Sequence, residues 1–296
     1  MKVLLTGAGG FIGRHVRAVL RDLSHRVVAH VHSRDGELDE GSLPSGLDAV
    51  VNCAGRLGGQ GATPAEMRAA NVALPARLAR LCAARGMPMV HLSTPGVTGL
   101  LPEAGEDLPP APWGEYERTK AEAEEVLQRT LPPKLLTVLR PDFVYGPGDT
   151  HKLAMFRQVS RGWFPLVGEG DALLRPTYVS DVARSVAESL PGGRLAGGLY
   201  NIGGPEVVSV RELVGLIGGA LGRRVLTLPV PRPLLRACLR LGPLHPPSLS
   251  ESRLRLFGED HYVAVEKAAA AGFRPRVAPP EGIAATVDWY RRRRML

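Results

Sequence analysis

Residues 6–13 read TGAGGFIG, a glycine-rich sequence close to the start of the chain. A short apolar run, residues 3–5, stands before it and predicts a buried strand. Apolar residues at helical spacing over 12–20 follow it and predict a helix. The glycines therefore occupy a turn that leads from a strand directly into a helix.

Each glycine of this turn has a different use. Gly7 permits a tight turn out of the strand, Gly10 lets the backbone approach a pyrophosphate, and Gly13 lets the helix pack on the strand. The unpaired N–H groups at the start of the helix would face the phosphates. In this strand–turn–helix context the spacing predicts a dinucleotide site.

Strand and helix patterns continue to alternate outward from the turn. Strands are predicted over 26–31, 48–52, 89–93 and 135–139, and helices over 65–85 and 116–129. This alternation predicts an α/β fold, a Rossmann-type doubly wound parallel sheet. After about Gly148 the alternation weakens, and we expect a smaller C-terminal α/β substrate lobe. The predicted division is 1–149 with 176–203 for the dinucleotide-binding domain, and 150–175 with 204–296 for the lobe.

The end of the second strand bears on the choice of cofactor. An acidic residue in this place holds the ribose diol of NAD, whereas this chain reads Val31-His32-Ser33-Arg34. The basic side chains of His32 and Arg34 suit a ribose 2′-phosphate. We therefore favour NADP(H); the alternative is NAD(H), with His32 and Arg34 solvated and Asp35 turned toward the ribose.

A tyrosine and a lysine stand four residues apart on the helix 116–129. The segment YERTK places Tyr116 and Lys120 on one helix face. A free phenol has a pKa near 10, and a neighbouring ammonium lowers it. The pair is suited to general acid–base catalysis at a carbonyl or hydroxyl oxygen. The strand that ends in Ser93-Thr94 supplies a hydroxyl to orient the same oxygen.

Together these motifs resemble the extended short-chain dehydrogenase/reductase family, also called the NAD-dependent epimerase/dehydratase family. The resemblance covers nearly the whole chain. Its motifs are TGAGGFIG at 6–13, GLDAVVNCAG at 46–55, HLST at 91–94, YERTK at 116–120, LRPDFVYGPGD at 139–149, RPTYVSDVA at 175–183 and YNIGGPEVVSVREL at 200–213.

The resemblance implies roles for individual residues. Catalysis would fall to Thr94, Tyr116 and Lys120, with Lys120 also binding the nicotinamide ribose. The resemblance places further residues along the cofactor, from pyrophosphate to nicotinamide: Gly7, Gly10, Phe11, Ile12, Glu37, Leu38, Ala54, Gly55, Pro141 and Val144. Near the substrate it implies Ser93, Asn71 as a support, and Arg175 as a candidate phosphate ligand.

Departures from the family pattern narrow the reaction. Pro95 and Gly96 replace the acidic pair that follows the threonine in nucleotide-sugar dehydratases, so a dehydratase is not expected. The segments at 168–183 and 228–242 resemble members acting on sterols and other hydrophobic carbonyls at least as well as nucleotide-sugar epimerases. We expect NAD(P)-dependent hydride transfer at a carbonyl or hydroxyl carbon of a nucleotide sugar or a hydrophobic substrate. The alternatives are an epimerase that retains NAD and a non-catalytic NAD(P)-binding accessory subunit or sensor.

Composition excludes several other classes. The net charge is +8, but the arginines are scattered except for 291–294, and no aromatic residues interleave them, so nucleic-acid binding is not expected. The chain has no apolar run of membrane-spanning length and no signal-peptide pattern. Three distant cysteines and isolated histidines predict neither a disulfide framework nor a metal site. We expect a cytoplasmic protein with a small-molecule substrate, and a homodimer through helices around 65–85 and 116–130.

Overall fold

The central feature of the computed structural model is a six-stranded parallel sheet with the order β10-β5-β4-β3-β1-β2. The structure describes residues 1–296 except 37, 39–40, 42, 59–61 and 241–249. The strands of this sheet are β1 (Lys2–Thr6), β2 (Arg26–His30), β3 (Ala49–Asn52), β4 (Met89–Leu92), β5 (Leu136–Pro141) and β10 (Gly198–Ile202). The Rossmann-type sheet predicted from the sequence is confirmed.

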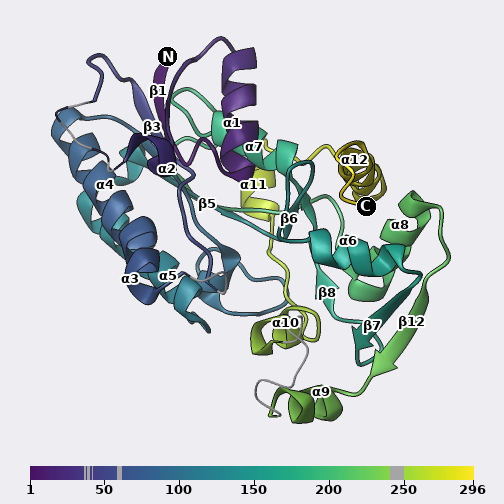
Figure 1. Ribbon diagram of the computed structural model, residues 1–296. Helices are drawn as coiled ribbons and strands as arrows, with labels where there is room; N and C mark the ends of the chain where they lie inside the picture. Colours follow the sequence, from purple (N-terminus) through teal and green to yellow (C-terminus); the bar gives the residue numbers. More distant parts are fainter. Residues whose placement is uncertain (37, 39–40, 42, 59–61, 241–249) are drawn as a thin grey trace.

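Helices cover both faces of the sheet, as Figure 1 shows. On one face lie α1 (Phe11–Asp22) and α7 (Val179–Ala187), and on the other α4 (Leu74–Arg85) and α5 (Glu115–Thr130). Strand β1 shows why both faces are apolar: Val3 and Leu5 join the first cluster and Leu4 joins the second. Alternating side chains of a parallel strand thus enter two cores.

One predicted helix, 65–85, is divided in the structure. It consists of α3 (Pro64–Arg68), a π-helical turn (Ala69–Ala73) and α4. Thr63 and Glu66 form a capping box at its start. A π-turn carries one residue more than an α-turn and is frequent at functional sites. Here the turn contains the buried Asn71.

A second part of the chain packs around its own apolar cluster, and we call it the second lobe. Its helices include α6 (Leu153–Ser160), α8 (Val210–Leu221) and α12 (Pro279–Arg292), which enclose buried residues such as Phe156, Ile217 and Tyr290. Three two-stranded pairings accompany them: β6 (Val144–Tyr145) with β9 (Thr177–Tyr178), β8 (Leu173–Leu174) with β11 (Val208–Ser209), and β7 (Trp163–Val167) with β12 (Leu226–Val230). The remaining helices are α2 (His32–Asp35), α9 (Arg232–Leu239), α10 (Glu251–Leu256) and α11 (Glu266–Ala270), with 3-10 turns at Pro95–Thr98 and Pro133–Leu135.

A buried ion pair ties α5 to the sheet. The Arg140 guanidinium donates to both carboxylate oxygens of Glu124, at 3.0 and 2.6 Å, and both side chains are buried. Glu124 lies one helical turn after Lys120, so this pair also fixes the helix that carries the tyrosine and lysine. Removing one partner would leave the other as an uncompensated buried charge.

We expect Glu124→Ala to lower the free energy of unfolding by about 3–5 kcal/mol, because Arg140 would stay buried without its partner. The matched control is Glu122→Ala on the same helix. Its ion pair with Arg68, at 2.6 Å, is exposed, so the loss should be under about 1 kcal/mol. Urea denaturation measures both, and equal losses would contradict the assignment.

Candidate active site

The glycine turn brings the start of α1 against the loop after β3. Gly7 has φ +69°, and a Cβ there would lie 2.5 Å from the backbone nitrogen of Ala54. A Cβ on Gly13 would collide with the Gly7 carbonyl oxygen. Gly10 is the N-cap of α1 and has no side chain, so the first N–H groups at Phe11 and Ile12 stay open to an anion. This geometry fits a pyrophosphate.

At the end of β2 an apolar side chain occupies the place expected for a ribose-binding acid. A Cβ on Gly9 would lie 3.0 Å from Cγ1 of Val31, so Val31 faces the glycine turn. His32 and Arg34 follow on α2, with Arg34 exposed. The Arg34 guanidinium donates to both oxygens of Asp35, at 2.6 and 2.8 Å, and Asp35 also accepts from the Val31 N–H. Asp35 thus competes with any phosphate for Arg34.

Of the neighbouring residues Glu37 and Leu38, which the resemblance places along the cofactor, the structure describes only Leu38. Leu38 is buried, and its carbonyl oxygen accepts a hydrogen bond from Arg77. Leu38 packs in the apolar cluster between the sheet and α4. Glu37 lies outside the described residues.

A chain of buried polar groups crosses the carboxyl ends of β1, β3 and β4 and reaches Lys120. Thr6 Oγ1 donates to Asn52 Oδ1 at 2.6 Å, and Asn52 Nδ2 lies 3.0 Å from Nδ1 of His91. His91 Nε2 lies 3.4 Å from Nζ of Lys120, which donates to the Leu92 carbonyl oxygen at 2.5 Å. All four side chains are buried.

Hydrogen-bond directions along this chain fix where the His91 proton sits. The Ala54 N–H donates to Asn52 Oδ1 at 3.1 Å, and because a backbone N–H only donates, Oδ1 is the acceptor and Nδ2 the donor. His91 Nδ1 must then accept, so the neutral ring carries its proton on Nε2, facing Lys120. Burial, with Lys120 adding to it, holds the pKa of His91 well below its usual range. His91 is therefore neutral, and it packs inside the sheet as a buried polar residue.

The pKa of the Lys120 amine is also shifted from its usual value. Burial lowers the pKa of Lys120 to about 8, while Glu124 and Cys53 act in the opposite direction. The N–H of His91, directed at the amine, also disfavours the ammonium form. Lys120 is thus poised to gain or lose a proton near neutral pH.

Tyr116 is held through its backbone by Asn71. Asn71 Nδ2 donates to Thr119 Oγ1 at 2.9 Å, and Thr119 Oγ1 donates to the Tyr116 carbonyl oxygen at 2.7 Å. Asn71 also exchanges hydrogen bonds with the backbone of Arg56, at 2.8 and 3.0 Å. The π-turn therefore links the loop after β3 to α5.

The structure differs from the sequence-based expectation for the tyrosine pKa. Burial, followed by the charge of Glu117, raises the pKa of Tyr116 above its ordinary value. The expected lowering by Lys120 is not seen, because the lysine amine turns to the Leu92 carbonyl oxygen and His91. A phenol with a raised pKa is a proton donor rather than a resident phenolate.

A cavity of about 130 Å³ opens beside Thr94. Its lining includes Pro141, which the sequence placed at the nicotinamide end, and apolar residues from several segments: Leu100, Leu101, Trp113, Phe143, Leu256 and Val263. Thr94 is half-buried, and its Oγ1 accepts a weak hydrogen bond from the Gly96 N–H at 3.4 Å. We call this space the Thr94 cavity.

Two acidic residues of the Thr94 cavity were missed from the sequence. Burial raises the pKa of Glu117 and raises that of Asp142 to about 7. Glu117 lies over Gly96, where a Cβ would approach its Cγ to 2.5 Å. Asp142 is buried and accepts from the Val263 N–H at 3.3 Å. Their position inside YERTK and LRPDF was the only sequence signal.

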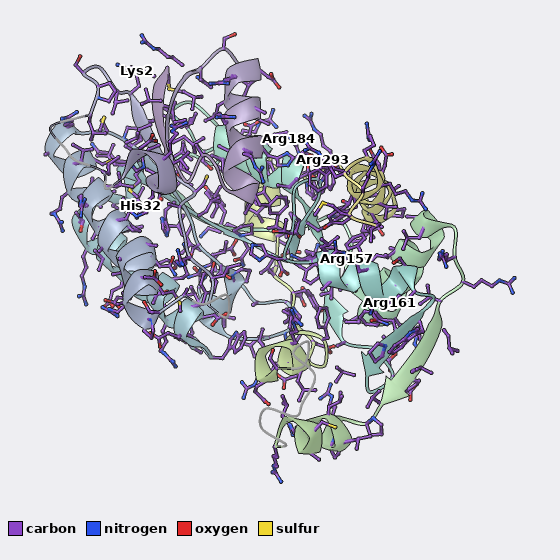
Figure 2. All side chains as sticks on the ribbon, viewed as in Figure 1. Lys2, His32, Arg157, Arg161, Arg184 and Arg293 are labelled. Atoms are coloured by element: carbon purple, nitrogen blue, oxygen red, sulfur yellow. The ribbon has the colours of Figure 1, made fainter. Side chains whose placement is uncertain are left out.

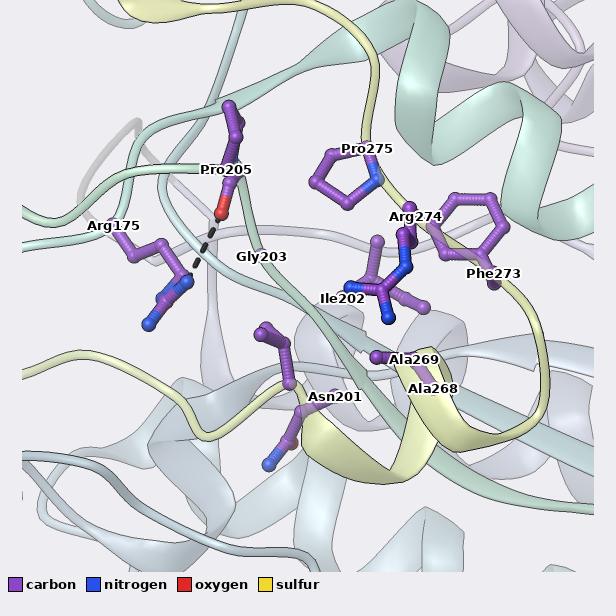
Figure 3. A pocket seen from close by; sticks show the side chains of 12 residues that line it. Arg175, Asn201, Ile202, Gly203, Pro205, Ala268, Ala269, Phe273, Arg274 and Pro275 are labelled. Atoms are coloured by element: carbon purple, nitrogen blue, oxygen red, sulfur yellow. Dashed lines mark hydrogen bonds between the residues drawn. The ribbon is translucent and has the colours of Figure 1, made fainter.

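Arg175 lines a different cavity, of about 200 Å³. Figure 3 shows Arg175 and Arg274 on opposite sides of it. The Arg175 guanidinium donates to the Gly204 carbonyl oxygen at 3.1 Å and lies 5.9 Å from the ring centre of Tyr262, a residue of the Thr94 cavity. Arg175 thus lies between the two cavities but does not line the one beside Thr94.

The structure also gives the positions of Gly55, Val144 and Ser93, which the resemblance placed near the cofactor or the substrate. Gly55 adjoins the site, since a Cβ there would lie 3.4 Å from Asn71 Oδ1 and 4.0 Å from Lys120 Nζ. Val144 is half-buried at the start of β6. Ser93 is buried, and its hydroxyl oxygen has no hydrogen-bond partner among the described residues. Within the described ranges, no group of three or more His, Cys, Asp or Glu is arranged to hold a metal ion.

Comparison with known proteins agrees with this geometry. Residues 3–203 match the model of the NAD dependent epimerase/dehydratase family. The chain is 30% identical to a 2-alkyl-3-oxoalkanoate reductase of Stenotrophomonas maltophilia (strain K279a), over 96% of this chain and 97% of the relative. It is 29% identical to a 4-hydroxy-2-methyl-3-oxo-4-farnesyl-3,4-dihydroquinoline-1-oxide ketoreductase of Stigmatella aurantiaca, over 82% and 80%.

A solved structure shows the same architecture. The Thermus thermophilus UDP-glucose 4-epimerase, in complex with NAD, is similar with a TM-score of 0.74 and 25% identity, over 98% of this chain and 99% of that chain. The curated relatives are named as reductases, the solved epimerase is in complex with NAD, and the matching family is NAD dependent, so this chain is an NAD(P)-dependent oxidoreductase or epimerase. The protein belongs to the NAD dependent epimerase/dehydratase family.

Proposed function

We propose that the protein is an NADP(H)-dependent reductase that converts a ketone on a mainly apolar substrate to an alcohol. The observation that carries this proposal is the lining of the Thr94 cavity. Apolar side chains form most of its wall, and its only charged residues among those described are the carboxylic acids Glu117 and Asp142.

This lining disfavours a diphosphate beside the reacting carbon. An anion held near the half-buried Glu117 and the buried Asp142, without a lysine or arginine in the described wall, would lose its hydration without gaining a partner. A hydrocarbon chain, in contrast, is stabilised by burial against leucine, phenylalanine and valine. The names of the two reductase relatives describe ketone substrates with alkyl or farnesyl groups, which supports the same class.

The residues of the site divide the reaction between them. NADPH, when bound, supplies the hydride. Thr94 Oγ1 and the Tyr116 hydroxyl bind the ketone oxygen, and Tyr116 donates its proton as negative charge develops there. To stabilise the resulting phenolate and return a proton to it, the Lys120 ammonium turns from the Leu92 carbonyl oxygen toward Tyr116.

The preference for NADP(H) follows from the end of β2. Val31 offers no carboxylate to a ribose diol, while His32 and Arg34 stand next in the chain on α2. The exposed Arg34 would exchange its bond to Asp35 for a 2′-phosphate.

A nucleotide-sugar epimerase that retains NAD is the second candidate. Arg175 and Arg274, on opposite sides of the larger cavity, favour it because two guanidinium groups suit a diphosphate. An epimerase shows no net consumption of cofactor, so oxidation of NADPH on adding an alkyl ketone separates the two candidates. The homodimer and the cytoplasmic location stay predictions.

Tyr116→Phe should lower kcat for ketone reduction by about a hundredfold or more, because it removes the proton donor. Binding of the cofactor, followed by quenching of protein fluorescence, should persist. Tyr200→Phe is the control, since Tyr200 lies on β10 and lines neither cavity. Equal activity of the Tyr116 variant and the control would refute the mechanism.

Arg34→Ala should weaken NADPH binding by about tenfold while leaving NADH binding unchanged, since only NADPH offers a phosphate to the guanidinium. Asp35→Asn should strengthen NADPH binding, because it removes the competing charge and keeps an acceptor for the Val31 N–H. Arg21→Ala, an exposed change at the end of α1, serves as control. Titration calorimetry measures all four proteins, and tighter binding of NADH by the unaltered protein would overturn the cofactor assignment.

The rate of reduction should fall as pH rises through about 8. Below this pH Lys120 is an ammonium ion that supports the phenolate, and above it the buried amine has lost its proton, since burial lowers its pKa to about 8. A profile of kcat/KM against pH shows the fall. Lys120→Arg retains a charge that does not titrate, so any remaining activity should lack this limb. A flat wild-type profile to pH 10 would show that Lys120 does not titrate in catalysis.

A further inference from the structure

An apolar face on the second lobe is unexplained by the active site. Strands β7 and β12 pair in parallel, with Leu226 opposite Trp163 and Leu228 opposite Pro165. Side chains two apart share one face of a strand, so these four residues lie on the same side, and we call them the ribbon face. Trp163, Leu226 and Leu228 are 42%, 64% and 41% exposed.

The opposite side of this pair of strands is ordinary core. Phe164 and Leu166 alternate with the ribbon face and pack into the apolar cluster of the second lobe. The two strands are therefore anchored in the core of the second lobe, and the ribbon face has a defined structure. In Figure 1 it belongs to the part of the second lobe that lies away from the central sheet, with α9 beyond it.

Helix α9 continues the exposed apolar surface. None of its residues is buried, and Leu234 is 54% exposed. Arginines recur at Arg232, Arg236 and Arg240, a spacing of four that places them on one side of the helix. A short helix with leucines and an arginine stripe is typical of segments that lie in a membrane interface.

Three more arginines stand at the other end of the ribbon face. Arg161 precedes β7, and Arg223 and Arg224 precede β12. Figure 2 shows Arg161 on the second lobe. Together with Arg232, Arg236 and Arg240 they form what we call the arginine frame. All six are exposed, and none makes an ion pair with a carboxylate of the described residues.

Charge decides which partner fits. A second copy of this chain on the same face would bring two sets of unpaired arginines together, which costs free energy. An anionic bilayer offers acyl chains to the ribbon face and headgroup phosphates to the arginine frame. We propose that this surface docks the protein on anionic lipid membranes as a peripheral protein. Among the described residues no helix has the length and apolar composition of a membrane span.

Docking would place the Thr94 cavity near the lipid. Helix α9 packs against α10, and Leu256 at the end of α10 lines that cavity. An apolar substrate dissolved in the membrane would then enter without crossing water. The docking itself rests on the surface alone and stands whether or not the proposed reaction is correct.

The test uses the full chain and sedimentation with vesicles at low salt. Vesicles of phosphatidylglycerol should bind the protein, and vesicles of phosphatidylcholine should bind it at least about tenfold more weakly. Binding should shift the tryptophan emission to shorter wavelength. Trp163→Phe should keep the binding and lose most of the shift, since it removes the fluorophore in the contact.

Two double variants separate the apolar and the charged contributions. Leu226→Ser with Leu228→Ser, and separately Arg223→Glu with Arg224→Glu, should each weaken binding to phosphatidylglycerol vesicles by about tenfold or more. The matched controls are Leu23→Ser, an equally exposed leucine after α1, and Arg21→Glu with Arg26→Glu. Circular dichroism and cofactor binding confirm that each variant is folded.

Three results would overturn the proposal. They are no binding to phosphatidylglycerol vesicles, binding that both double variants leave unchanged, and equal binding to both lipids. Loss of binding on deleting residues 291–296 instead would assign the membrane contact to the C-terminal arginines. A concentration-dependent dimer that the leucine variant abolishes, without vesicle binding, would show that the ribbon face joins two copies of the chain.

Discussion

The bond between the Lys120 amine and the Leu92 carbonyl oxygen, 2.5 Å long, is the contact on which the site depends. It joins α5 to the end of β4, where Thr94 follows two residues later. The amine is buried, and it is kept there by the Leu92 carbonyl oxygen and the nearby Glu124 carboxylate. A buried cation without such partners would be expelled or would lose its proton. Its position therefore sets the distance between the helix that carries Tyr116 and the strand that carries Thr94.

A second constraint is the separation of charge between two cavities. Acids line the space beside Thr94, and arginines line the larger space beyond Tyr262. Arg175 stands between them, close enough to lower the pKa of Asp142 against the larger effect of burial. A molecule that reached both spaces would need an apolar or uncharged end beside Thr94 and an anionic end beside Arg175. The charges of the two cavities therefore restrict which end of a substrate can lie in each of them.

Local patterns predicted the sheet well because apolar residues repeat differently in strands and in helices, and each pattern is visible within one element. Val3, Leu4 and Leu5 show a strand buried on both faces, and the spacing of Tyr116 and Lys120 requires only a helix. The buried chain from Thr6 to Lys120 could not be predicted this way, because its members come from three strands and one helix. Nor could the ribbon face, since Trp163 and Leu226 are adjacent only after β7 and β12 have paired. The sequence does not distinguish Asp142 from an exposed loop carboxylate, because its raised pKa results from burial in the folded chain.

The π-turn at Ala69–Ala73 constrains the number of residues in this part of the chain. An α-helix rotates by roughly 100° per residue, so one residue more or less turns every following side chain to another face. Deleting a residue here would convert the turn to regular helix and swing the Asn71 amide away from Arg56 and Thr119. Chain length is thus as restricted as residue type at this one turn.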